Sequence, residues 1–439
     1  MKQKIPFKDI DNDTIDKVLA ILEEEVVPAG GCTEPIALAY VAAKAREVLG
    51  RIPDRMNIYV SGDIIKNVKS AVVPKSGGRA GIEIAAAMGA IAGEPEKELM
   101  VIQDITKNDM KKVISFIKNN PINVIHKQTD AKLYIKIELF SGSKSASVEV
   151  KHLHTNITLI EKNGKVLLRQ ACSDADFNSP LTDRKILTVK LIYNLAKSID
   201  LKLIKPLFEK VIRLNSAIAE VGLKETYGVN VGSCIMKSIK EGIYGYDRKN
   251  VCASYAAAGS DARMSGCPLP VMTTSGSGNQ GMTASLPLIK YCQEKKICRE
   301  KLIRGLFFSH LTTIHIKTNI GRLSAYCGAV CAASAVSGAI AFIDGENLET
   351  ISNAITNTLG NISGMICDGA KASCSMKIAT GIYSAFDGAM LAQNQRTLHS
   401  GDGIIGKDVE ETIRNIGELS QAGMQKTDDV ILGIMTNRK

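Results

Sequence analysis

The sequence predicts an α+β protein in which an N-terminal module with an antiparallel sheet and helices precedes a larger, mainly α-helical domain. Strand-like alternation of apolar and polar residues gathers between residues 56 and 168, whereas helical spacing dominates from about residue 174 onward. The chain has 439 residues, more than one compact core usually holds. We expect N-terminal helices over 1–50 that carry the Cys32 elbow and pack on the helical domain, an α+β domain over 51–174, and the helical domain over 175–439.

The first helix is predicted over residues 13–25, where apolar residues recur on one face. The segment 28–35, Pro-Ala-Gly-Gly-Cys-Thr-Glu-Pro, ends it, and a second helix follows over residues 36–49. Cys32 therefore lies in a glycine-flanked elbow directly before a helix. Backbone N–H groups and the helix dipole favour a thiolate there, so we expect a lowered pKa for Cys32.

The sheet is predicted from short segments that alternate between apolar and polar residues. A first strand is expected at 57–61, followed by a loop at 75–81 and helices at 82–92 and 109–118. Further strands are expected at 132–139, 145–152, 156–161 and 165–168, with a Lys-Asn-Gly hairpin turn at 162–164.

The remaining segments carry helical spacing. The expected helices are 183–198, 202–219, 234–241, 251–262, 301–317, 325–342, 348–359 and 404–422. Because aromatic residues make up only 5% of the chain and Ala, Gly and Ser are abundant, we expect the helices to pack closely.

Charge and hydropathy exclude several classes of protein. The net charge is +10, but basic residues are dispersed among acids, which argues against nucleic-acid binding and favours small anionic substrates. The apolar run 327–343 is shorter than the roughly 20 residues that a membrane span needs. The N-terminus lacks the apolar core of a signal peptide. We expect a cytoplasmic protein with neither membrane nor nucleic-acid partners.

Three of the eleven cysteines carry the main chemical hypothesis. Cys367 and Cys374 are separated by six residues beside Gly369, and Cys327 lies near the start of the neighbouring predicted helix 325–342. Three thiolates on a cuboidal iron–sulfur cluster leave one iron without a protein ligand, and that iron can act as a Lewis acid. Zinc binding and ordinary buried thiols remain alternatives. Simple packing or surface placement is expected for Cys172, Cys234, Cys252, Cys267, Cys292 and Cys298.

A glycine-rich run between residues 272 and 283 is a candidate anion site. Its Ser275, Ser277, Gly278, Asn279 and Gln280 offer backbone N–H groups, hydroxyls and amides to a carboxylate or phosphate. Neither dinucleotide-binding nor P-loop spacing is present. The alternative is a flexible linker.

Two basic residues are further candidates for anion binding. Arg263 could hold a carboxylate through two parallel hydrogen bonds, or form a surface salt bridge with Asp261. Lys66 could reach an anionic substrate from a strand end, or be a solvated lysine. No Ser–His–Asp constellation can be argued from the histidines.

Five ordered motifs give the chain a resemblance to the L-cysteine desulfidase family, which is related to iron–sulfur L-serine dehydratases. The motifs are Gly-Gly-Cys-Thr-Glu-Pro-Ile-Ala at 30–37, Ser-Gly-Asp-Ile-Ile-Lys-Asn at 61–67, Ser-Gly-Ser-Gly-Asn-Gln-Gly at 275–281, Gly-Arg-Leu-Ser-Ala-Tyr-Cys-Gly at 321–328 and Gly-Met-Ile-Cys-Asp-Gly-Ala-Lys-Ala-Ser-Cys at 364–374.

The resemblance implies a [4Fe–4S] cluster held by Cys327, Cys367 and Cys374, with Cys32 as the base at the substrate α-carbon. Serine dehydratases carry His-Thr where this chain has Cys32-Thr33, and their last cysteine pair is more widely spaced, which favours the desulfidase branch. An alternative makes Cys32 a cluster ligand and leaves Cys374 free. We prefer Cys32 as base because a helix start lowers a thiol pKa without a metal.

The predicted activity is that of a carbon–sulfur lyase that eliminates hydrogen sulfide from L-cysteine, leaving pyruvate and ammonia. Ser275, Ser277, Gly278, Asn279 and Gln280, with Arg263 or Lys66, are expected to bind the substrate carboxylate. No feature of the sequence requires pyridoxal phosphate. The alternatives are an iron–sulfur L-serine dehydratase and a cluster-free small-molecule-binding protein. Helices rich in small residues could also pack between the subunits of a homo-oligomer.

Overall fold

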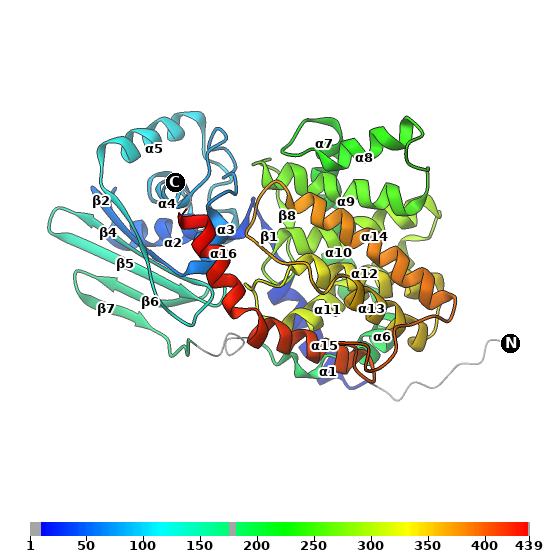
Figure 1. Ribbon diagram of the computed structural model, residues 1–439. Helices are drawn as coiled ribbons and strands as arrows, with labels where there is room; N and C mark the ends of the chain where they lie inside the picture. Colours follow the sequence, from blue (N-terminus) through cyan, green and yellow to red (C-terminus); the bar gives the residue numbers. More distant parts are fainter. Residues whose placement is uncertain (1–9, 175–180, 438–439) are drawn as a thin grey trace.

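The computed structural model describes residues 10–174 and 181–437, and it confirms the predicted α+β class. Figure 1 shows a body that contains the sheet beside a larger body made of helices. Each body has its own core of buried apolar side chains. The pocket described in the next subsection draws its lining from both bodies.

The sheet has six strands in the order β3-β2-β4-β5-β6-β7. Their bounds are β2 Arg55–Val60, β3 Ile122–His126, β4 Tyr134–Ser141, β5 Lys144–Lys151, β6 Ile157–Lys162 and β7 Lys165–Arg169. All neighbours are antiparallel except β2 and β3, so the sheet is mixed rather than wholly antiparallel as expected. Strand β3 was not predicted because it is an edge strand with mostly exposed side chains and therefore lacks apolar alternation.

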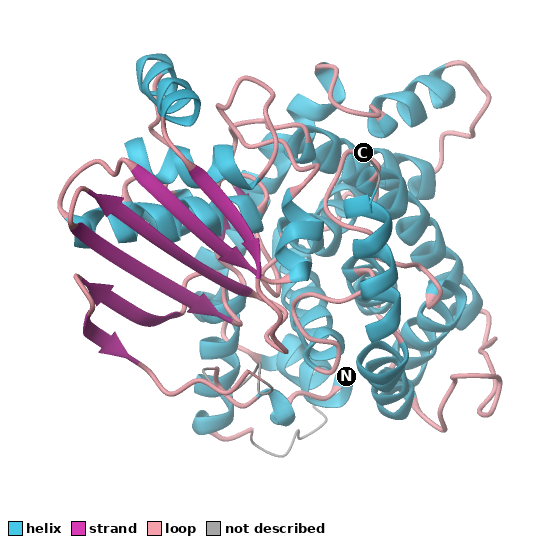
Figure 2. Ribbon diagram, turned by 60° about the vertical axis from the view of Figure 1, so that its left-hand side comes forward, coloured by secondary structure: helices cyan, strands magenta, loops and turns pink. Residues whose placement is uncertain are grey.

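Helices cover one face of this sheet, as Figure 2 shows. They are α2 (Thr33–Leu49), α3 (Gly62–Val68), α4 (Ile82–Ala92) and α5 (Lys107–Asn119), with the short helix η1 at Pro95–Met100. Helix α2 packs on β4 and β5, and α4 packs on α2 so closely that a Cβ at Gly89 would lie 1.9 Å from the Ala39 carbonyl oxygen. Small residues therefore permit this contact, as the composition predicted.

The second body consists of helices around the larger apolar core. Its elements are α1 Asn12–Glu25, η2 Arg184–Ile186, α6 Val189–Ser198, α7 Leu201–Lys224, α8 Val231–Lys240, α9 Arg248–Met264, α10 Gly278–Glu294, α11 Arg299–Thr318, α12 Gly328–Asp344, α13 Leu348–Ile362, α14 Cys374–Gln393, α15 Val409–Glu418 and the π-helix η3 Leu419–Gly423. Helices α10 and α14 were not predicted. Helix α10 starts in the glycine-rich run and contains Pro287, and α14 has many small residues that obscure its periodicity.

Two connections join the bodies. Strands β1 (Pro28–Ala29) and β8 (Val271–Met272) pair antiparallel, and the C-terminal helix α16 (Gln425–Asn437) packs against α3. The first 50 residues do not pack as one unit, because α1 belongs to the helical core whereas α2 packs on the sheet. The exact domain boundaries stay a prediction.

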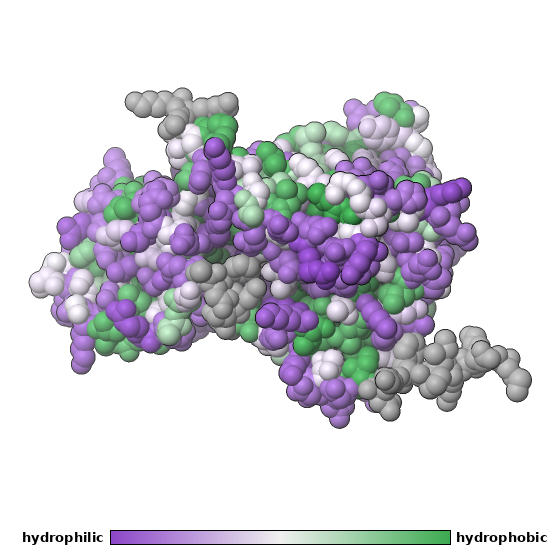
Figure 3. All heavy atoms as spheres, turned by 60° about the horizontal axis from the view of Figure 1, so that its bottom comes forward, coloured by the Kyte–Doolittle hydropathy of each residue, from purple (hydrophilic) through white to green (hydrophobic). Residues whose placement is uncertain are grey.

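None of the helices in the described residues combines the length and the apolar character that a membrane span requires. On the face drawn in Figure 3, hydrophilic residues predominate and hydrophobic residues occur in scattered patches.

Candidate active site

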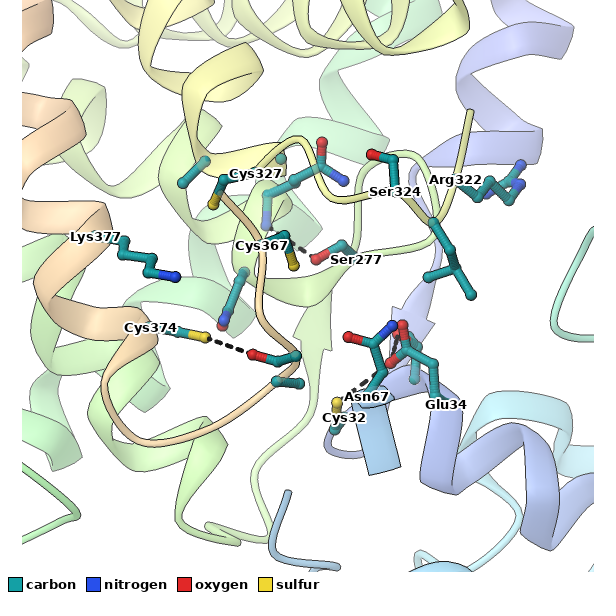
Figure 4. Close-up of a pocket in the computed structure, with 18 of the residues that line it drawn as sticks. Cys32, Glu34, Asn67, Ser277, Arg322, Ser324, Cys327, Cys367, Cys374 and Lys377 are labelled. Carbon is teal, nitrogen blue, oxygen red and sulfur yellow. Dashed lines mark hydrogen bonds between the residues drawn. The ribbon is translucent and has the colours of Figure 1, made fainter. Parts of the chain in front are cut away.

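A pocket at the junction of the two bodies brings together most of the predicted site residues (Figure 4). The space in it measures about 700 Å³ when its opening to solvent is included. The residues predicted for the site that line it are Cys32, Arg263, Ser277, Asn279, Gln280, Cys327, Cys367 and Cys374. Segments far apart in the sequence thus contribute to one cavity.

Four helices begin at this pocket. Cys32 is the N-cap of α2, Ser277 the N-cap of α10 and Cys327 the N-cap of α12, while Cys374 is the first residue of α14. The N-terminus of a helix carries unpaired N–H groups and partial positive charge. The walls of the pocket therefore favour anions, whether carboxylates or thiolates.

The segments that carry Cys327 and Cys367 hold each other through the backbone. The Cys367 N–H donates to the Ala325 carbonyl at 2.6 Å, and the Cys327 N–H donates to the Met365 carbonyl at 3.1 Å. This short antiparallel bridge fixes the two thiols side by side. Figure 4 shows Cys374 on the same side of the pocket, whereas Cys32 lies on the other side.

Gly369 allows the loop between Cys367 and Cys374 to lie against the α+β body. Its φ is +95°, and a Cβ there would lie 2.4 Å from the Lys66 carbonyl oxygen. Any other residue would both strain the backbone and push the loop away from α3. The glycine therefore sets where the two thiols lie relative to the rest of the pocket.

The three thiols suit a cluster better than a single ion. Among the described residues, no three His, Cys, Asp or Glu side chains lie close enough together to hold one metal ion. Burial, then the neighbouring Cys367, raises the pKa of Cys327 to about 12, and burial also raises the pKa of Cys374. Without a metal these two groups are therefore thiols. Soft sulfur donors on three separate positions of one cationic pocket fit an iron–sulfur cluster, in which each thiolate binds a different iron.

Two lysines that the sequence analysis missed also line the pocket. Lys317, near the end of α11, is 4% exposed and forms no ion pair within the described part of the chain. Lys377 on α14 pairs with Asp368. Lys317 is the last residue of the predicted helix 301–317, where a lysine is normally exposed, so its burial could not be inferred from the sequence.

Cys32 is buried at 2% exposure, and its Sγ donates to Glu34 Oε2 at 3.3 Å. Burial, followed by the charge of Glu34, raises the pKa of Cys32 well above its usual value, although Arg263 acts in the opposite direction. The expectation of a lowered pKa was therefore wrong, because desolvation outweighs the helix start. In this structure Cys32 is a thiol.

Arg263 presents an unsatisfied guanidinium to the pocket. The side chain is 2% exposed, and Nη1 donates to Asn279 Oδ1 at 3.1 Å, while Nε and Nη2 have no partner among the described residues. The alternative of a salt bridge to Asp261 is wrong, since that carboxylate accepts the Gly232 N–H at 2.9 Å instead. Gly278 leaves room for the guanidinium, because a Cβ there would lie 2.3 Å from Arg263 Nε.

The glycine-rich run is a structured turn rather than a flexible linker. Its end forms the first turn of α10, where the Ser277 hydroxyl accepts the Gln280 N–H at 3.4 Å. Ser275 has φ +49° and belongs to the preceding turn, outside the pocket lining. The run therefore supplies Ser277, Asn279 and Gln280 to the pocket lining, while Gly278 packs against the Arg263 guanidinium.

Lys66 does not line this pocket. Its ammonium is fully buried and pairs with Asp63 at 2.9 Å and with Asp428 of α16. The alternative of a solvated lysine is wrong, and so is the expected strand end, because Lys66 lies on α3. Asp428 also accepts the Ala325 N–H at 3.0 Å, so this pair supports the segment that carries Cys327 from behind.

Comparison with known proteins agrees with a dehydratase-like site. Residues 96–433 match the family model described as the serine dehydratase alpha chain. The chain belongs to the serine dehydratase alpha chain family. A UPF0597 protein of Fusobacterium nucleatum is 63% identical over 422 residues, which are 96% of this chain and 99% of that protein. A UPF0597 protein of Desulfitobacterium hafniense is 45% identical, and the match covers 96% of each chain. A UPF0597 protein of Porphyromonas gingivalis is 37% identical, and the match covers 98% of this chain and 100% of that protein.

The serine dehydratase alpha match contains the three predicted cluster thiols and Arg263, whereas Cys32 lies before it. The predicted relation to serine dehydratases is thus confirmed at the level of the family. The names of these UPF0597 relatives state no reaction, so the desulfidase assignment stays a prediction.

Proposed function

We propose that this protein is an L-cysteine desulfidase, which converts L-cysteine and water to hydrogen sulfide, pyruvate and ammonia. The observation that carries the proposal is the pocket in which three thiols face Cys32 across a cationic space. Membership of the serine dehydratase alpha chain family supports a lyase that acts on a β-substituted amino acid.

Cys327, Cys367 and Cys374 would hold a [4Fe–4S] cluster. When bound, such a cluster supplies a Lewis-acidic iron that can withdraw electrons from the leaving sulfur of the substrate. Lys317 and Lys377 lie near these thiols and favour their thiolate forms. Buried thiols alone would not require two cationic side chains in the same pocket.

Arg263 would bind the substrate carboxylate through its unpartnered Nε and Nη2. Ser277 and Gln280 offer further polar groups, while Asn279 holds the guanidinium from the side. A guanidinium on the carboxylate stabilises the negative charge that develops when the α-proton leaves. Arg263 thereby contributes both binding and acidification of the α-carbon.

Cys32 would take the α-proton as its thiolate, after its own proton has passed to water. Arg263 favours that thiolate, since its charge acts against the burial that keeps Cys32 protonated. After elimination, the aminoacrylate product tautomerises and is hydrolysed in water to pyruvate and ammonia without further help from the protein. The sulfur leaves as hydrogen sulfide after it takes up a proton.

The test uses anaerobically reconstituted protein with L-cysteine or L-serine as substrate. The proposal predicts that sulfide and pyruvate form from L-cysteine in equal amounts and that L-serine gives at least about tenfold less pyruvate, a difference of about 1.4 kcal/mol in the barrier. Faster turnover of L-serine would support the second candidate, an iron–sulfur L-serine dehydratase, which the family match favours. Failure to bind iron at all would favour the cluster-free binding protein.

A further inference from the structure

An acidic side chain in the pocket complements Arg263. Glu34, on the first turn of α2, is 7% exposed and lines the same cavity. Its carboxylate accepts the Cys32 S–H at 3.3 Å and the Thr33 hydroxyl at 3.1 Å. Within the described part of the chain no lysine or arginine forms an ion pair with it. A buried carboxylate without a cationic partner is costly unless a ligand supplies the charge.

Glu34 and Arg263 both lie close enough to Cys32 to act on its thiol. Glu34 is in hydrogen-bond contact with Cys32 Sγ, and the positive charge of Arg263 also acts on that sulfur. An α-amino acid carries an ammonium and a carboxylate on the same carbon. If the carboxylate meets Arg263 and the ammonium meets Glu34, the α-carbon lies near Cys32.

We propose that Glu34 binds the α-ammonium of the substrate and thereby restricts the site to α-amino acids, as opposed to α-hydroxy acids. This inference rests on the proposed function, because it places the α-carbon beside the proposed base. The ammonium competes with the Cys32 S–H for the same carboxylate oxygen. Substrate binding therefore neutralises the Glu34 charge that raises the pKa of Cys32, so that the thiol can pass its proton to water before it takes the α-proton.

L-Alanine and L-lactate provide a matched pair of probes. Both have a methyl group and an α-carboxylate, and they differ in the ammonium or hydroxyl on the α-carbon. Dissociation constants are measured by anaerobic titration calorimetry on the reconstituted full-length chain. A charge-assisted hydrogen bond predicts that the wild type prefers L-alanine over L-lactate by about 10- to 100-fold.

Glu34→Gln is expected to reduce this preference to about threefold or less, because a neutral amide of the same shape retains the cavity. Glu34→Asp keeps the charge and should retain a clear preference for L-alanine. Glu47→Gln on the exposed part of α2 is the matched control and should leave the preference unchanged. Binding of L-lactate by each variant shows that its pocket is intact.

A Glu34→Gln variant that still prefers L-alanine as strongly as the wild type does overturns this inference. So does a wild type that binds both probes equally. Sulfide release from L-cysteine is measured separately on the wild type. If the preference depends on Glu34 but no sulfide forms, the proposed reaction is wrong while recognition of the amino acid stands.

Discussion

Asp428 on the C-terminal helix provides a direct test of how the fold supports the site. It accepts hydrogen bonds from Lys66 and from the Ala325 N–H, and it lies behind the segment that leads to Cys327. Asp428→Asn keeps the shape but turns an amide N–H₂ toward one of these donors. Loss of one hydrogen bond to a charged group costs about 1.5–3 kcal/mol, and Lys66 keeps Asp63 at 2.9 Å. We therefore expect a loss of about 2 kcal/mol in the free energy of unfolding.

The removal of Lys66 should cost more. After Lys66→Met, the cation that remains near the buried Asp63 and Asp428 among the described residues is Lys132, which lies 3.8 Å from each and is partly exposed. Breaking a buried ion pair typically costs about 3–5 kcal/mol. The assay is urea unfolding of the metal-free chain, with iron content after anaerobic reconstitution as a second readout. Asp429→Asn, which alters the exposed neighbour on the same helix, is the control. The reasoning fails if Asp428→Asn unfolds at the same urea concentration as Asp429→Asn.

Three further variants test the pocket and the helical core. Gly278→Ala places a Cβ 2.3 Å from the Arg263 Nε and should raise the KM for L-cysteine about tenfold in initial-rate kinetics. In the control Gly364→Ala the added Cβ meets no atom within 4 Å, so the KM should stay unchanged. Lys317→Met removes an ammonium that is buried without an ion-pair partner among the described residues, so the melting temperature of the metal-free chain should rise. The iron retained after anaerobic gel filtration should fall. A lower melting temperature would contradict this. Burial lowers the pKa of His310 to about 3, so at this residue only the unfolded chain gains a proton as the pH falls below 6.5, and the free energy of unfolding falls by about 1.4 kcal/mol per pH unit. His310→Asn should remove this contribution to the pH dependence of stability, measured by urea unfolding between pH 6 and 4. An identical pH dependence in the variant and the wild type would refute this.

The sequence predicted the site motifs that are continuous in the chain better than it predicted which residues contact them. The motifs around Cys327 and Cys367 are continuous in sequence, and the structure brings both to one pocket. The sequence left two roles open for Arg263, binding of a carboxylate ligand or a salt bridge to Asp261. Residues two apart on a helix point in different directions, which excludes the salt bridge. The predicted helix 251–262 ended one residue before Arg263, whereas α9 continues to Met264 and buries the arginine.

Residues whose function depends on distant contacts were not predictable. Lys66 pairs with Asp428 across 362 residues, which no local pattern reveals. Glu34 belongs to the motif at 30–37, but only the three-dimensional structure shows that its carboxylate is buried without a lysine or arginine partner among the described residues. The pKa of Cys32 was misjudged because sequence shows a helix start but not the depth of burial that opposes it.

The most direct test of the account compares iron and acid-labile sulfide in anaerobically reconstituted Cys367→Ser and Cys32→Ala. The account predicts that Cys367→Ser loses the brown iron–sulfur absorption, whereas Cys32→Ala keeps the iron and sulfide content of the wild type but releases no sulfide from L-cysteine. A colourless Cys32→Ala protein, or a Cys367→Ser protein with a full complement of iron, would contradict it.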